Sequence, residues 1–546
     1  MITQMSTTVL SESKGAKRTG ILLISGAAAA LAFSINGLFI LTWVSFSVLF
    51  ALINYNTGKG RVLRSLFCFF FAFYEVLYSW FINLYPLDFA GLNNFQSVLV
   101  IIAALTLIPA VHASLMSLVI HIALRLTRAQ GLAKCFVFSF SYMLGEFLQS
   151  KGQLAFPWGR LFVSQISRLE ILQSASLFGS YFITFIIILC NTFLANALFL
   201  QKSKRVKILY GSLAAAVFAF NFIFGAIRLN LYSDKTTKLI TVASLQGNMS
   251  SEEKWSGGVT ETAINRYKNL WDSLNSNSQN KINAENTPVL FVTPETAFPL
   301  TLYRDKILPS YKAEKIDSEI KEMCRKSKAY FVIGAFESEN GKTYNSLYLY
   351  DSVGNAPSAF YRKQHLVPFG EYLPFRTAFE IFLPMLTELN LFGDDLSAGN
   401  TPENLPEING TKIGGLICFD SVFPELCRKQ VNAGARLIIL STNDSWYKTS
   451  AALSQHCAHA IMRAIENNVS IIRSANTGIS MNILPTGEIS GSLGAQKYGS
   501  VVSTLPITSE KTLYTRTGDI ILYLGTAIIA AMSIINAITK LKKKIR

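Results

Sequence analysis

Long apolar segments alternate with short basic segments over the first 230 residues of the chain. A helix needs roughly 20 apolar residues to cross the hydrocarbon core of a bilayer. Eight segments approach that length, at 20–35, 37–54, 65–85, 95–124, 133–149, 174–200, 208–229 and 519–539. The first two are short and closely spaced, so they form either two tilted spans or one re-entrant hairpin. The pattern predicts a seven-span membrane domain over 20–230 and an eighth span over 519–539.

A polar region, residues 236–512, separates the seventh span from the eighth. Its short β-branched apolar runs predict strands, and segments of helical periodicity lie between them. The predicted strands are 239–245, 289–292, 330–335, 413–418, 437–441 and 469–473, and the predicted helices are 260–274, 316–326, 424–433 and 453–467. Alternation of this kind predicts a layered α/β domain.

The basic residues fall in alternate loops of the predicted membrane domain. Five clusters lie within 14–18, 59–64, 125–134, 202–207 and 540–546. Under the positive-inside rule these loops and both termini, 1–19 and 540–546, are cytoplasmic, so the polar region lies outside. This placement explains the formal net charge of +16 without nucleic acid as a partner. A composition that is 50% apolar also favours a membrane protein.

Three side chains of the polar region are candidates for catalytic chemistry. Glu295 follows the predicted strand 289–292, at an edge where α/β folds often place their sites. Cys418 ends the predicted strand 413–418, where nearby N–H groups would favour a thiolate and an oxyanion. Lys363 could lower the cysteine pKa and stabilise an oxyanion, with Glu371 orienting it. Singly, such residues are more often surface charges or structural cysteines.

The set of Glu, Lys and Cys in this chain order resembles the carbon-nitrogen hydrolase, or nitrilase, superfamily. More closely, nearly the whole chain resembles the apolipoprotein N-acyltransferase family. The matching segments are 246–248 with Trp255, 294–295, 363–371, 417–418, 443–446 and 473–478. The resemblance implies an αββα nitrilase-like sandwich for the outer domain. It also implies a Gram-negative inner-membrane protein whose catalytic domain lies in the periplasm.

The resemblance also implies a role for each residue and a ping-pong reaction. Glu295 would be the general base, Lys363 the cation that stabilises the oxyanion, and Cys418 the nucleophile. Glu371 corresponds to a second family glutamate. Cys418 would take an acyl chain from a glycerophospholipid, typically phosphatidylethanolamine, and pass it to the α-amine of a diacylglyceryl apolipoprotein. The implied partners are these two substrates and the lipid bilayer, with no cofactor and no metal.

The residues after the nucleophile depart from the family pattern. The family usually has Cys-Tyr-Glu, whereas this chain has Cys418, Phe419 and Asp420, which removes a hydroxyl and shortens a carboxylate. These two residues and Asn443 are expected to support the site. The departures bear on efficiency and lipid preference more than on the class of reaction.

Aromatic residues are candidates for an acyl chamber or a lid. They are Trp255, Trp446 and Tyr447, and the alternative is that they pack as ordinary core or interface aromatics. The family usually continues Trp-Phe-Gly, whereas this chain has Tyr447 and Lys448 after Trp446.

Other polar residues in apolar or helical segments receive structural interpretations. His456, Cys457 and His459 invite a metal reading, but on a helix the cysteine faces away from both histidines and no acid completes the ligands. Glu75 and Glu146 fall in predicted spans, where we expect them to pair with a neighbouring helix or lie near a span end. The seven cysteines match no zinc spacing, and a disulfide among the last four stays open.

Two other functions fit part of this pattern. A membrane-anchored amidase or nitrilase would hydrolyse a C–N bond with the same Glu, Lys and Cys, but small amides would not require seven preceding spans. A degenerate binding module would not need Glu295, Lys363, Glu371 and Cys418 all intact. The sequence therefore favours an acyltransferase over both.

Overall fold

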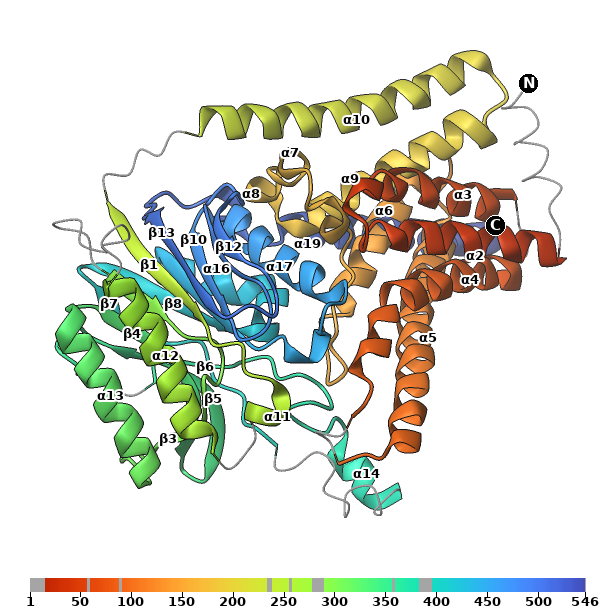
Figure 1. The fold of residues 1–546 in the computed structure, drawn as a ribbon. Coiled ribbons are helices and arrows are strands. Elements are labelled where there is room, and N and C mark those ends of the chain that lie inside the picture. The colour runs from red at the N-terminus through yellow and green to blue at the C-terminus, as the bar shows by residue number, and fades with distance from the viewer. Residues whose placement is uncertain are drawn as a thin grey trace. The chain divides into compact units, whose positions relative to one another are not determined.

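The chain divides into two compact units (Figure 1). The computed structural model describes residues 15–55, 59–87, 91–232, 238–254, 258–276, 289–355, 359–382 and 395–545. The membrane unit contains Met1–Ile82, Val98–Leu231 and Thr517–Arg546, and the sandwich unit contains Asn83–Ser97 and Tyr232–Arg516. The segment Asn83–Ser97 thus belongs to the sandwich unit although it lies between two predicted spans.

Each of the eight predicted apolar segments contains a long helix of the membrane unit. These are α2 (Gly15–Leu31), α3 (Leu41–Tyr55), α4 (Lys59–Leu77), α5 (Asn94–Thr127), α6 (Gly131–Leu148), α9 (Ser180–Ala195), α10 (Lys204–Leu231) and α19 (Ile520–Ile545). Short helical turns lie at Asn36–Leu38, Ser79–Leu84, Leu161–Gln165, Leu169–Leu172, Ala175–Phe178 and Asn196–Leu200. In the described part of the chain, 6 helical segments are long and apolar enough to cross a bilayer, which makes the chain a multi-pass membrane protein.

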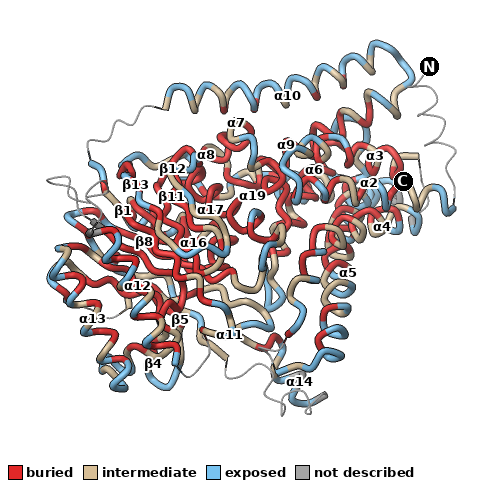
Figure 2. Tube along the Cα trace, in the orientation of Figure 1, coloured by how far each residue is buried: buried red, intermediate tan, exposed pale blue. Residues whose placement is uncertain are grey.

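Three of the six candidate spans, at Asn94–Thr127, Lys204–Leu231 and Ile520–Lys543, expose most of their length. Helix α10 is largely exposed along its length (Figure 2), and its Phe220 is 78% exposed. Exposed apolar helices of this length are stable in a bilayer because lipid chains cover the side chains and the helix satisfies its own backbone groups.

Four hydrogen bonds connect the helix ends that carry the basic clusters. The pairs are Arg18 with the Leu52 carbonyl, Tyr55 with the Phe199 carbonyl, Lys134 with Asn54 Oδ1 at 2.6 Å, and Asn536 with the Leu126 carbonyl at 2.7 Å. Each pair lies within a few residues of a basic cluster. The five clusters therefore gather at one end of the membrane unit.

The intramembrane acid Glu146 pairs with neighbouring segments, as expected. Thr184 Oγ1 on α9 donates a 2.7 Å hydrogen bond to its Oε2, and the Leu161 N–H donates one of 3.0 Å to Oε1. Glu146 is buried, so these partners offset the cost of removing its carboxyl group from water. Glu75 is half-buried on α4.

Two sheets form the sandwich unit. The first runs in the order β13-β1-β2-β4-β5-β6, with β3 also paired to β4, and the second in the order β12-β11-β10-β9-β8-β7. The first sheet contains β1 (Leu239–Gln246), β2 (Val289–Val292), β3 (Phe298–Arg304), β4 (Tyr330–Glu339), β5 (Lys342–Tyr350), β6 (Tyr361–Arg362) and β13 (Gly499–Pro506). The second contains β7 (Glu407–Ile408), β8 (Thr411–Ile417), β9 (Leu437–Thr442), β10 (Ser470–Ala475), β11 (Ser480–Ile483) and β12 (Ile489–Leu493).

Alternating side chains of the strands build separate cores on the two faces of each sheet. In β2, Leu290 and Val292 join residues of the second sheet, such as Ile439, in the inner core. Phe291 points the other way and packs with the outer helices. The sheets approach closely at Gly415, where an added Cβ would lie 2.8 Å from the side chain of Tyr361.

Helices cover both outer faces of the sandwich. Helices α12 (Val259–Ser276) and α13 (Tyr311–Ser327) pack on the first sheet. Helices α16 (Pro424–Asn432) and α17 (Ala452–Asn467) pack on the second, where Gln430 bonds to the backbone of Gly415 at 2.8 and 2.7 Å. The predicted αββα sandwich is confirmed. All six predicted strands and all four predicted helices are present, although β8 ends at Ile417 and leaves Cys418 outside the strand.

Candidate active site

Glu295, Lys363 and Cys418 lie just beyond the ends of strands. Lys363 and Cys418 directly follow β6 and β8, and Glu295 comes three residues after β2. Their exposed fractions are 5%, 1% and 7%, respectively. The structure thus brings together, away from water, three residues that are far apart in the sequence.

Glu295 is held by donors on both carboxylate oxygens. Its Oε1 accepts hydrogen bonds from Lys363 Nζ at 3.0 Å and from Asn345 Nδ2 at 2.7 Å. Its Oε2 accepts one from the N–H of Asn443 at 2.8 Å, so Asn443 supports the base through its backbone. The side chain of Asn443 accepts a 3.1 Å bond from Asn476. These donors hold the Glu295 carboxylate in one orientation.

Lys363 bridges two carboxylates. Besides Glu295 it donates a 2.7 Å hydrogen bond to Oε1 of Glu371, whose Oε2 accepts the N–H of Val367 at 2.9 Å. Glu371 therefore orients Lys363, as expected. Burial alone would lower the pKa of Lys363, but Glu295 and Glu371 outweigh it and raise that pKa well above its usual value. The side chain is an ammonium at any physiological pH.

Cys418 is the first residue of the short helix Cys418–Val422, and its φ of +50° lies in the left-handed region. A non-glycine residue in this region is strained and persists only where its surroundings hold it. The sequence predicts a thiolate at Cys418, and the structure contradicts that expectation. Burial and the Glu295 carboxylate raise the pKa of the Cys418 thiol well above its usual value, and Lys363 lowers it by less. The resting thiol is therefore protonated, and its reaction requires a base.

Asp420 connects the nucleophile to the segment that carries Lys363. Its Oδ2 accepts hydrogen bonds from the Tyr361 hydroxyl and the Ile417 N–H, and its Oδ1 accepts the N–H groups of Gln364 and His365. Burial raises the pKa of Asp420 to about 6, although these donors lower it. Asp420, which is shorter than the glutamate usual in the family, thus has four hydrogen-bond donors in this chain.

Phe419 turns into the core beside the site. It is 2% exposed, and its ring lies 5.2 Å from that of Phe423, edge to face. The ring of Phe423 in turn stacks on His365 at 3.6 Å. Phe419 therefore supports the nucleophile loop by packing.

The candidate lid aromatics are described only in part. Trp446 and Tyr447 lie in the short helix Ser445–Tyr447 after β9 and are half-buried. Burial and then Cys418 raise the pKa of Tyr447 well above its usual value, and its ring lies 6.1 Å from that of His456, edge to face. Trp255 lies outside the described residues.

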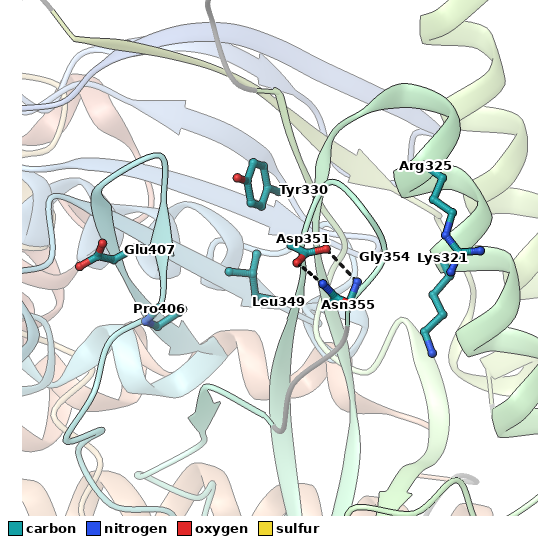
Figure 3. A pocket seen from close by; sticks show the side chains of 9 residues that line it. All are labelled: Lys321, Arg325, Tyr330, Leu349, Asp351, Gly354, Asn355, Pro406 and Glu407. Carbon is teal, nitrogen blue, oxygen red and sulfur yellow. Dashed lines mark hydrogen bonds between the residues drawn. The ribbon is translucent and has the colours of Figure 1, made fainter.

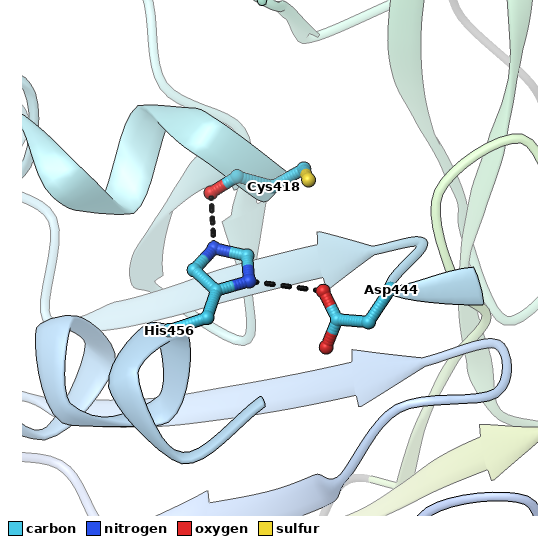
Figure 4. A group of neighbouring side chains, drawn as sticks. All are labelled: Cys418, Asp444 and His456. Carbon is cyan, nitrogen blue, oxygen red and sulfur yellow. Dashed lines mark hydrogen bonds and ion pairs between the residues drawn. The ribbon is translucent and has the colours of Figure 1, made fainter. Parts of the chain in front are cut away.

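A buried network behind Cys418 was not predicted from the sequence (Figure 4). His456 Nε2 lies 3.1 Å from the carbonyl oxygen of Cys418 and 3.1 Å from Ser421 Oγ. Its Nδ1 lies 2.9 Å from Asp444, whose other oxygen accepts a 2.7 Å bond from Arg473. Burial alone would raise the pKa of Asp444, but Arg473 and His456 lower it well below its usual range. The network holds the carbonyl group of Cys418, whose backbone is strained.

The same network contains a set of atoms spaced like metal ligands. One atom each from Cys418, Asp444 and His456 lies within 4.8 Å of the others. The acid therefore comes from the loop after β9, which corrects the expectation that no acid completes a set around His456. The protonated thiol is a poor ligand, because metals bind the thiolate, and both ring nitrogens of His456 already take part in hydrogen bonds. The arrangement fits a hydrogen-bonded support better than a metal site.

Two further facts bear on the remaining cysteines and cavities. All seven cysteines are free, including the four of the sandwich unit. A surface cavity of about 600 Å³ (Figure 3) is lined by Lys321, Arg325, Tyr330, Leu349, Asp351, Gly354, Asn355, Pro406 and Glu407. None of these residues belongs to the Glu295, Lys363 and Cys418 site, so the candidate chemistry lies elsewhere.

An αββα sandwich with Glu, Lys and Cys at its strand ends is the architecture of a carbon-nitrogen hydrolase. The profile of the carbon-nitrogen hydrolase family matches residues 241–516, about half of the chain, and the chain belongs to this family. The profile of the apolipoprotein N-acyltransferase N-terminal domain matches residues 25–193. Together the two matches place the chain among the apolipoprotein N-acyltransferases.

Relatives with this name match most of the chain. The apolipoprotein N-acyltransferase of Gloeobacter violaceus is 28% identical over 459 residues, which are 84% of this chain and 82% of the relative. That of Geobacter metallireducens is 29% identical over 524 residues, 94% of each chain. Among solved structures, Saccharomyces cerevisiae Nit3 of the nitrilase superfamily is 19% identical and covers 50% of this chain and 92% of its own, with a TM-score of 0.36.

Proposed function

We propose that this enzyme transfers an acyl chain from a glycerophospholipid to the N-terminal α-amine of a diacylglyceryl apolipoprotein through a thioester on Cys418. The observation that carries the proposal is the contact of Lys363 Nζ with Glu295 Oε1, at 3.0 Å, beside a buried and protonated thiol. A neutral thiol needs a base, and Glu295 is the carboxylate with the largest electrostatic effect on this thiol. Membership of the apolipoprotein N-acyltransferases supports the choice of substrates.

The first half-reaction forms the acyl-enzyme. Glu295 removes the proton from Cys418, and the sulfur attacks the carbonyl carbon of a phospholipid ester. The oxyanion that forms is stabilised by the Lys363 ammonium, which the buried site makes more effective than in water. The ester C–O bond then breaks, the leaving alkoxide takes the proton from Glu295, and a lysophospholipid departs.

The second half-reaction consumes the thioester. The neutral α-amine of the diacylglyceryl-cysteine attacks the thioester carbonyl, and Glu295 accepts a proton from the attacking nitrogen. The C–S bond breaks, and the proton returns to the sulfur of Cys418. The product is an amide at the lipoprotein N-terminus, and the enzyme regains its resting state.

The proposal also covers the acyl donor and the orientation of the chain in the membrane. We propose phosphatidylethanolamine as donor, on the family resemblance, and a Gram-negative inner membrane as the location. The five basic clusters gather at one end of the membrane unit, which supports a cytoplasmic placement of that end and of both termini. Helix α10 starts at that end and α19 finishes there, so the inserted residues 236–512 would lie in the periplasm.

A labelling experiment tests the proposed function. The full-length protein in detergent is incubated with an alkyne-tagged phosphatidylethanolamine, and then with a diacylated lipopeptide. We expect a hydroxylamine-sensitive adduct on the enzyme that disappears as the lipopeptide becomes N-acylated. Absence of any adduct on the wild-type enzyme, or release of ammonia from simple amides instead, would overturn the proposal, and the second result would favour a membrane-anchored amidase.

A further inference from the structure

A second lysine lies buried against the turn that carries the base. Lys254 ends helix α11 (Ser251–Lys254) and is 1% exposed. Its Nζ donates a 2.6 Å hydrogen bond to Thr296 Oγ1 and a 3.1 Å hydrogen bond to the carbonyl oxygen of Glu295. Both acceptors belong to the turn after β2, so the Lys254 ammonium forms hydrogen bonds with two consecutive residues of that turn.

That turn has little freedom to move and needs contacts that hold it. Thr296 has a φ of +43°, which is costly for a β-branched residue. The turn also packs directly on β4, because a Cβ added to Gly334 would lie 2.2 Å from the carbonyl oxygen of Pro294. Strained backbone of this kind persists only where the surrounding structure fixes it. The two hydrogen bonds of Lys254 are part of that fixation.

Lys254 places a second ammonium beside Glu295, one of the two carboxylates that pair with Lys363. Glu295 and Glu371 carry two negative charges, whereas Lys363 carries one positive charge, and Cys418 is neutral at rest. Burial lowers the pKa of Lys254 to about 8, against the effects of Glu295 and Cys418, while Lys363 lowers it further. Lys254 is therefore still largely an ammonium at neutral pH and supplies the second positive charge.

We propose that Lys254 is a positioning residue for the base, whose ammonium clamps the Glu295 turn and balances the second carboxylate of the buried site. The inference rests on the proposed function. During acylation one negative charge passes from Glu295 to the sulfur and then to the oxyanion, while the total charge of the site stays constant. A fixed countercharge therefore favours every stage of this transfer over uptake of a proton from water by Glu295.

Two variants separate the charge of Lys254 from its hydrogen bonds. Lys254→Gln keeps an N–H donor without the charge, and Lys254→Met removes both. Alkylation of Cys418 by iodoacetamide is followed by mass spectrometry from pH 5 to 9 in the full-length protein, and thioester formation is followed in parallel. We expect the acidic limb of both profiles to move up by about one pH unit in both variants, which slows the reaction by up to about tenfold at the acidic end of the range.

Lys268→Met is the matched control, because Lys268 forms a 2.7 Å ion pair with Glu319 on the outer helices. It should leave both profiles unchanged. A Lys254→Gln protein with the wild-type alkylation profile would overturn the inference. It would show that an N–H donor without a charge is enough at this position, so the role of Lys254 would be structural only. Alkylation needs no lipid, so a wild-type enzyme that alkylates normally but forms no thioester would count against the proposed function and not against Lys254.

Discussion

The hydroxyl of Tyr361 donates a 2.8 Å hydrogen bond to Oδ2 of Asp420. Tyr361 lies in β6, two residues before Lys363, and Asp420 lies two residues after Cys418. The same carboxylate accepts the N–H groups of Gln364 and His365 at 3.2 and 2.8 Å. Asp420 therefore sets the position of the proposed oxyanion cation relative to the proposed nucleophile, across the two sheets.

Asp420→Ala should destabilise the sandwich unit and slow acylation. It leaves one hydroxyl and several N–H donors buried without their acceptor, at about 1–3 kcal/mol for each group that water cannot reach. Thermal unfolding of the full-length protein and single-turnover thioester formation measure the two effects. Glu407→Gln, at the exposed edge strand β7, is the control. Wild-type stability in Asp420→Ala would show that these hydrogen bonds do not hold the loops.

The stability contributed by Asp420 should depend on pH. Its pKa is raised by burial from 3.8 to about 6, so the folded state binds the proton more tightly than the unfolded state. The contribution is then fully present below about pH 4 and is lost as the pH rises through about 6, a change of about 3 kcal/mol. Between pH 4 and 7, the wild-type melting temperature should fall relative to that of Asp420→Asn. Parallel curves for the two proteins would contradict this assignment.

Cys418→Ser should abolish the lipid adduct, whereas Cys427→Ser should retain it. Both thiols are buried and free, but Cys427 lies on α16 near Arg463 and Glu466 rather than beside Glu295 and Lys363. Burial raises the pKa of Cys427 to about 12, and the nearby carboxylate of Glu466 is paired with Arg463 at 2.9 Å. In-gel detection of the alkyne adduct before and after hydroxylamine makes the comparison. Equal labelling of the two variants would remove Cys418 from the nucleophile role.

Glu295→Gln should slow acylation by about 10²–10⁴-fold, the usual contribution of general base catalysis. The amide keeps an oxygen that accepts from Lys363 or Asn443, so folding should survive. Because the resting thiol of Cys418 is protonated, no preformed thiolate can compensate for the lost base. Rapid-quench measurement of thioester formation gives the rate. Near-normal acylation would assign the proton transfer to another group.

Periodicity alone was enough for the elements that are continuous and strongly apolar. The runs of β1, β2, β4, β8, β9 and β10 are buried central strands, and the eight apolar segments of the membrane unit hold long helices. Strands such as β12, which is largely exposed, lack this signal, because an edge strand carries polar and glycine residues. β5 and β6 were missed as well, although β6 precedes Lys363.

The residue types of the candidate site could be read from its motifs, and the structure brings Glu295, Lys363, Glu371 and Cys418 together as the resemblance implied. Their catalytic roles stay predictions. Lys254, Asn345 and His456 lie outside the matching segments, whereas Asp444 and Arg473 lie within two of them but carried no assigned role. Lys254 had a weaker hint, because it directly precedes Trp255, which belongs to the matching residues.

The sequence by itself determined which segments are apolar enough to form long helices, which runs form buried strands, and which side chains are candidates for the chemistry, because these depend on local composition and order. Only the tertiary structure decided whether the sulfur of Cys418 is protonated at rest. The pKa of Cys418 depends on its burial and on charges that arrive from β2 and β6, more than 50 residues away in the chain. The sequence suggested that Lys363 and nearby N–H groups would favour a thiolate, but burial and the carboxylate of Glu295 raise the pKa of the Cys418 thiol, which therefore stays protonated at rest.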